Sequence, residues 1–218
     1  MQTENKMLMA NARKALSGKW GLAIGGFVVY ELSVIVFSIV SRLILVVIFG
    51  KTPITSTLGS MALYLVMGPL LVGVMFFYLS LSRNHDTHIR DLFKGFKDYW
   101  RATGTYLLMV LFVVLWTILL IIPGIIAGLS YSQTFYILAE DDSIGPLEAI
   151  RKSKKMMYGY KWKLFCLGLR FIGWCLLSIL TLGIGFLWLF PYMVVSYAKF
   201  YDDVKSNHTE TLAPQPIS

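Results

Sequence analysis

The chain has 218 residues, a formal net charge of +8 and a mean hydropathy of +0.65. Charged residues make up 15% of it, against about 25% in soluble domains, and the deficit is concentrated in four long apolar blocks. This excludes an ordinary soluble domain, and the absence of alternating ten-residue segments argues against a membrane β-barrel. The composition therefore predicts an all-α, polytopic helical membrane protein.

In chain order, the apolar blocks cover residues 20–50, 58–81, 102–139 and 164–198. A helix needs roughly 20 apolar residues to cross a bilayer core, so the last two blocks are long enough to fold back. Pro123-Gly124 divides the third block, and Thr181–Gly185 divides the fourth. We therefore expect six spans, at 21–48, 58–82, 104–122, 125–140, 163–181 and 185–201.

These spans predict one membrane domain, 1–218, built from three hairpins at 20–83, 104–140 and 163–203. An N-terminal amphipathic segment (1–19) precedes them, in-plane helices lie at 84–103 and 141–162, and a flexible tail covers 204–218. Six spans place every Lys and Arg except Arg42, Lys51 and Arg170 on one side. By the positive-inside rule that side is cytosolic, so both chain ends are expected inside. A four-span arrangement would put the basic cluster of 141–163 outside.

The segments between hairpins are amphipathic and basic. In 84–103 the apolar residues Ile89, Leu92, Phe93, Phe96 and Trp100 share one helical face. Helices of this kind lie at the membrane surface and attract anionic lipid. The candidate head-group contacts are Arg90, Lys94, Lys97, Arg101, Arg151, Lys152, Lys154, Lys155 and Lys161.

Each hairpin follows a basic segment that ends in tryptophan, at Trp20, Trp100 and Trp162. The last two units also close on Asp pairs, Asp141-Asp142 and Asp202-Asp203. A threefold internal repeat is one interpretation, since repeats are common in transporters. The other is that tryptophan and lysine mark each inner interface, where we expect these tryptophans to act as anchors.

Two charges lie inside the apolar blocks at a similar expected depth, Glu31 and Arg170. An isolated charge there costs roughly 2.5–3.5 kcal/mol or more, so we expect the two side chains to pair. The pair could form a polar site for a proton, an ion or a head group. It could equally be a structural interhelical ion pair, or Arg170 could extend to the nearer interface.

No catalytic or metal-binding pattern appears in the sequence. His85 and His88 form a His-x-x-His patch without supporting cysteines, which favours a solvated loop over a metal site. We find no nucleophile with a base, no phosphate loop and no cofactor motif, and we expect no enzyme, cofactor or metal centre. Basic residues beside apolar blocks favour lipid over nucleic acid as the partner.

Several motifs carry a family resemblance. They are the run 119–131 with Pro123-Gly124 at its centre, the run 148–157, Gly159-Tyr160-Lys161, Thr181–Gly185, Trp188 and Pro191-Tyr192. Together they resemble a bacterial multi-pass integral membrane protein family catalogued as domain of unknown function 975, over most of the chain from about Trp20 to Tyr201. The resemblance implies a bacterial cytoplasmic membrane and brings no reaction, ligand or catalytic residue.

The leading functional hypothesis is a non-enzymatic protein of the cytoplasmic membrane that binds anionic lipids, in envelope homeostasis or as a membrane scaffold. A membrane-protein partner or a homo-oligomer is compatible with it. One alternative is a small transporter or channel-like carrier with Glu31 and Arg170 in a central cavity. A second is an immunity or resistance protein against membrane-active peptides.

Overall fold

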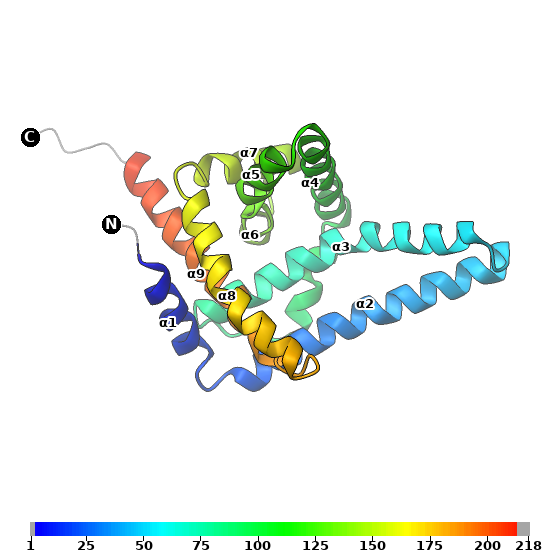
Figure 1. The fold of residues 1–218 in the computed structure, drawn as a ribbon, viewed down its shortest axis with the longest axis horizontal. Helices are drawn as coiled ribbons and strands as arrows, with labels where there is room; N and C mark the ends of the chain where they lie inside the picture. Colours follow the sequence, from blue (N-terminus) through cyan, green and yellow to red (C-terminus); the bar gives the residue numbers. More distant parts are fainter. Residues whose placement is uncertain (1–2, 213–218) are drawn as a thin grey trace, which may run out of the picture.

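The computed structural model describes residues 3–212, and this part of the chain is helical, without strands (Figure 1). Its elements in order are α1 (Asn5–Leu16), α2 (Trp20–Phe49), α3 (Pro53–Ser82), a 3-10 helix η1 (Ile89–Phe96), α4 (Tyr99–Leu119), α5 (Ile121–Tyr131), α6 (Thr134–Glu140), α7 (Pro146–Met156), α8 (Lys161–Leu180) and α9 (Phe186–Leu212). The all-α class is confirmed.

Five helical segments are long and apolar enough to cross a membrane: α2, α3, α4, the stretch Ile121–Glu140 that contains α5 and α6, and α8. They coincide with the first five expected spans. The expected sixth span, 185–201, forms the first part of α9, which is not among the five and carries Asp202, Asp203 and Lys205 further along. The six-span topology remains a prediction.

The helices form three successive units, each with a short element followed by two longer helical stretches: α1–α2–α3, then η1–α4–α5/α6, then α7–α8–α9. Each short element packs against the closing helix of another unit, η1 on α3, α7 on α6 and α1 on α9. Between units, α3 also packs against α4, α5 against α8 and α9 against α2. The contacts therefore run in a cycle that returns from the third unit to the first.

The closing helices of the three units supply the centre of the core. Each carries a Phe-Tyr dipeptide, Phe77-Tyr78 in α3, Phe135-Tyr136 in α6 and Phe200-Tyr201 in α9, and all six side chains are buried. The Tyr78 hydroxyl donates to the Ala23 carbonyl at 2.9 Å, and the Tyr136 hydroxyl donates to the Val194 carbonyl at 3.2 Å. These two buried hydroxyls are thus satisfied by the backbone of a neighbouring helix.

The backbone of η1 lies directly against α3 because glycine occupies the contact points. A Cβ atom at Gly73 would collide with the carbonyl of Leu92, and one at Gly95 would collide with the carbonyl of Pro69. The predicted in-plane helix across 84–103 is therefore divided: η1 ends at Phe96, and the residues from Tyr99 onward already belong to α4.

The break in the third apolar block falls before Pro123-Gly124. Leu120 has extended dihedral angles (φ −161°, ψ 142°) and separates α4 from α5, whereas Pro123 is the third residue of α5. Proline is tolerated in a first turn because its missing N–H would have no helical partner there. The expected break at Pro123 and Gly124 is thus corrected to Leu120.

The expected flexible tail, 204–218, is also wrong in part. Helix α9 continues to Leu212, and Val204 is fully buried. Residues 213–218 of that prediction lie outside the described residues. In Figure 1 the start of α1 and the end of α9 lie on the same side of the molecule, while the α2–α3 hairpin extends away from the other helices.

Candidate functional site

Charged groups at the ends of α3 and α6 and from within α9 meet in one ion cluster. Arg83 Nη2 lies 2.6 Å from Asp202 Oδ1 and 2.9 Å from Glu140 Oε1. Glu140 Oε2 lies 2.5 Å from Lys205 Nζ and accepts a hydrogen bond from the Tyr201 hydroxyl at 2.7 Å. Burial alone would lower the pKa of Arg83, but the two carboxylates outweigh it and raise the pKa above its ordinary value.

A second ion pair joins α8 to α9 beside the chain start. Lys163 Nζ lies 2.6 Å from Asp203 Oδ2, and the Thr3 backbone N–H donates to Asp203 Oδ1 at 3.2 Å. Burial alone would raise the pKa of Asp203, but these hydrogen bonds hold it below the usual value. Both clusters hold helix ends together, and no substrate is needed to explain them.

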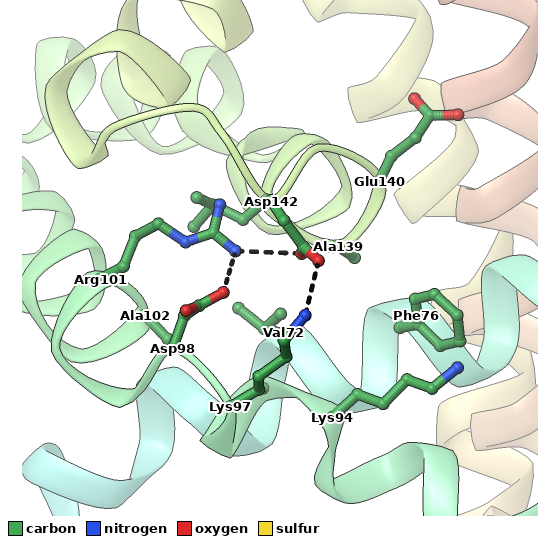
Figure 2. A pocket seen from close by; sticks show the side chains of 12 residues that line it. Val72, Phe76, Lys94, Lys97, Asp98, Arg101, Ala102, Ala139, Glu140 and Asp142 are labelled. Atoms are coloured by element: carbon green, nitrogen blue, oxygen red, sulfur yellow. Dashed lines mark hydrogen bonds and ion pairs between the residues drawn. The ribbon is translucent and has the colours of Figure 1, made fainter.

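A pocket of about 390 Å³ lies where η1 and α4 face the 139–142 segment, and Figure 2 shows its charged lining. Arg101 Nη2 bridges Asp98 at 3.4 Å and Asp142 at 3.3 Å, and Lys97 lies 3.7 Å from Asp142. Three cations and three carboxylates line the pocket, which therefore has no net preference for an anion. Its charges link η1 and α4 to the loop after α6.

The ion pairs around this pocket involve several of the basic residues that were candidate lipid head-group contacts. Lys94 pairs with Asp91 at 3.1 Å and lies 3.8 Å above the Phe76 ring, and Lys97 and Arg101 are engaged with Asp142. Arg90 is exposed, and Lys161 is half-buried at the start of α8. Residues 84–103 thus contribute mostly compensated charge.

Helix α7 presents four basic side chains that form no ion pair within the described part of the chain. Its side chains Arg151, Lys152, Lys154 and Lys155 are exposed, and none forms an ion pair with any residue in 3–212. The opposite face is buried, with Ser153 donating to the Ser130 carbonyl at 2.8 Å. The helix expected to lie in the membrane plane at 141–162 therefore turns most of its apolar residues to protein: Ile150 and Met157 are buried, and Leu147 is exposed.

One family comparison bears on this region. Residues 113–208 match the family described as protein of unknown function (DUF975). The match confirms the recognised resemblance over that part of the chain, from the second half of α4 into α9, and it contains α7, Glu140 and Asp202. No curated protein and no solved structure matches the chain.

The structure separates the expected polar pair. Glu31 lies half-buried on α2 and forms no ion pair with Arg170. Arg170, which lies within the DUF975 match, is exposed and lines a hollow with Lys6, Arg13 and Lys14 of α1. Arg170 thus lies beside the cations of α1 and is not paired with Glu31, an outcome that depth along the chain does not reveal.

The expected anchor tryptophans differ in exposure. Trp100 is 82% exposed and Trp162 is 72% exposed, whereas Trp20 is half-buried. Trp100 ends a series of ring contacts, with centroid distances of 6.4 Å for Phe93–Phe96, 6.4 Å for Phe96–Tyr99 and 5.3 Å for Tyr99–Trp100. An exposed aromatic row beside basic residues is typical of membrane-interface elements.

The ion cluster was missed in the sequence. Arg83 appeared there only as one of the cytosolic charges, and it lies before the DUF975 match. The Asp pair at 202–203 was the available signal, because it closes the third unit directly after the Phe-Tyr dipeptide of α9. His85 and His88 are exposed in the segment between α3 and η1, where the His88 backbone N–H donates to Asp91 at 2.9 Å.

Proposed function

We propose that this chain is a non-enzymatic integral protein of the bacterial cytoplasmic membrane that binds anionic lipid head groups through α7. The observation that carries the proposal is the exposed row of four cations on α7 without ionic partners among the described residues. Each basic residue near an anionic surface contributes about 1 kcal/mol. Four therefore supply roughly 4 kcal/mol, or about a thousandfold in affinity. Envelope homeostasis or membrane scaffolding is the corresponding biological role.

The membrane location is supported by the exposed apolar side chains of helices long enough to span a bilayer. Val47 on α2, Ile118 on α4 and Leu180 on α8 are all more than three-quarters exposed. Soluble monomers rarely expose apolar patches of more than a few hundred Å². Lipid is the solvent in which such surfaces are stable.

An orientation with both ends in the cytosol is supported by where the helix ends meet. The Arg83–Asp202, Arg83–Glu140 and Lys163–Asp203 contacts join the end of α3, the end of α6, the start of α8 and the polar part of α9. A six-span topology places these segments on one side, whereas Trp20, which it places on the same side, lines a hollow with Thr181 and Gly185 of the expected outer turn. The N-terminal Thr3 joins the same group through Asp203.

The test places a probe beside the four cations. Tyr158 follows α7 and is 85% exposed, so a bimane fluorophore attached through Tyr158→Cys, in a Cys166→Ala/Cys175→Ala background, reports lipid near this surface. In nanodiscs, doxyl-labelled phosphatidylglycerol is expected to quench it more than doxyl-labelled phosphatidylcholine. The preference should weaken in 0.5 M salt, because exposed charges are screened.

The matched variant replaces Arg151, Lys152, Lys154 and Lys155 with glutamine. It should lose the preference, whereas Arg42→Gln/Lys51→Gln, on and beside α2, should keep it. Quenching that ignores both lipid charge and salt would refute head-group binding by α7. The carrier alternative has no Glu31–Arg170 ion pair to support it. Resistance to membrane-active peptides stays a prediction.

A further inference from the structure

Two hollows meet between α1, α8 and α9, and together they have the polarity of a phospholipid. The first has a volume of about 590 Å³ and is lined by Lys6, Arg13, Lys14 and Arg170, with no carboxylate from the described residues. The second has a volume of about 310 Å³ and an apolar lining. Arg13 and Tyr192 line both, so the two hollows adjoin at these side chains.

The apolar hollow runs along matching faces of two helices. Trp174, Leu177 and Thr181 follow Arg170 on α8 at offsets of four, seven and eleven residues, which is one helical face. Trp188 and Leu189 line it from α9, and Trp20 lines it from the start of α2. From Arg170 to Thr181 the face is about 16 Å long, at 1.5 Å per residue.

The cations at the other end lack ionic partners. Among residues 3–212, none of Lys6, Arg13, Lys14 and Arg170 forms an ion pair, and the Arg13 guanidinium lies 5.8 Å from the centre of the Tyr192 ring. Four neighbouring like charges repel one another, so an anion that enters the hollow stabilises them. Arginine binds phosphate oxygens in bidentate geometry.

We propose that this groove is a specific site for an anionic phospholipid, with its phosphate between Arg13 and Arg170 and an acyl chain along Trp174 and Trp188. A free phosphate would satisfy the cations but would leave the apolar hollow open, and a zwitterionic lipid would bring a further positive charge. The proposal assumes the membrane location. It is independent of lipid binding by α7, which is a different surface.

The tryptophans make the site measurable. Trp100→Phe, Trp116→Phe and Trp162→Phe leave only the three groove tryptophans in the chain. This full-length protein, in dodecyl maltoside micelles, is titrated with brominated phosphatidylglycerol or brominated phosphatidylcholine, and tryptophan quenching is followed. We expect half-quenching at a clearly lower concentration of the anionic lipid. Soluble glycerol phosphate should not displace it.

Arg13→Gln/Arg170→Gln should reduce the preference for the anionic lipid by roughly fivefold for each charge removed. Arg13→Lys/Arg170→Lys should retain most of the preference, and Arg42→Gln/Lys51→Gln should retain all of it. Gel filtration checks that the variants stay monodisperse. If the glutamine variant does not stay monodisperse, the parent protein is measured in 0.5 M salt instead. There the preference for the anionic lipid should be lost.

Equal quenching by both lipids, or a preference unchanged by Arg13→Gln/Arg170→Gln, would overturn the site. Displacement by glycerol phosphate would do the same, because it would assign the hollow to a soluble anion. The α7 glutamine variant should keep the tryptophan preference. If this variant also loses the lipid preference reported by bimane, the two surfaces bind lipid independently. Either proposal can then fail without the other.

Discussion

Arg83 and Asp202 are 119 residues apart in the chain, yet their side chains are joined by a hydrogen bond of 2.6 Å from Nη2 to Oδ1. Glu140, from the middle unit, contacts the same guanidinium nitrogen at 2.9 Å. One arginine thus connects the closing helices of all three units. The cluster lies directly beyond the three buried Phe-Tyr dipeptides, so it closes the core at one end.

Arg83→Ala is expected to lower the free energy of unfolding by about 1–3 kcal/mol, because two partly buried carboxylates lose their shared cation. The readout is the unfolding midpoint of the purified protein in detergent. Arg90→Ala, which removes an exposed arginine outside the cluster, should change it by less than about 0.5 kcal/mol. Additive effects of Arg83→Ala and Asp202→Ala would contradict direct coupling.

The Lys163–Asp203 pair predicts a dependence of stability on acid pH. The pKa of Asp203 is lowered in the folded protein, so its contribution is complete above the unfolded value of about 4 and disappears as pH falls through the folded value. Unfolding midpoints measured from pH 7 down to pH 3 should therefore fall. Asp203→Asn should be less stable at neutral pH, and its unfolding midpoint should depend less on pH between 7 and 3. An unchanged pH dependence would exclude this carboxylate as a contributor.

Gly73→Ala should be strongly destabilising, because its new methyl group meets the backbone of η1 rather than a mobile side chain. Overpacking of this kind typically costs about 1–3 kcal/mol. Gly128→Ala is the matched control: it is also within a membrane-type helix, and a Cβ there has no neighbour within 4 Å. It should be neutral or slightly stabilising. Equal midpoints for the two variants would show that η1 does not lie on α3 as described.

The topology can be tested with single cysteines in the Cys166→Ala/Cys175→Ala background. With both ends in the cytosol, Lys51→Cys between α2 and α3 is expected to react with a membrane-impermeant maleimide in intact cells. Tyr158→Cys after α7 should react only after permeabilisation. Both positions are exposed. Labelling of Tyr158→Cys in intact cells would place α7 outside and exclude the proposed orientation.

Much of the helical architecture was predictable because apolar length and periodicity are local properties. The runs 21–48, 58–82 and 163–181 each became one helix within a few residues of the expected bounds. The break at Leu120 and the division of 84–103 were not predictable. They depend on which backbone groups find partners and on the glycine contact between α3 and η1.

The sequence by itself determined that this chain consists of apolar helices separated by basic, tryptophan-ended segments, because hydrophobicity and charge act through neighbouring residues. Only the tertiary structure decided which charges form ion pairs. Lys94, Lys97 and Arg101 are compensated by carboxylates, the four cations of α7 form no ion pair within residues 3–212, and Arg170 lies beside α1 rather than beside Glu31. The physical reason is that pairing depends on helix rotation and on contacts between distant segments, which residue spacing does not specify.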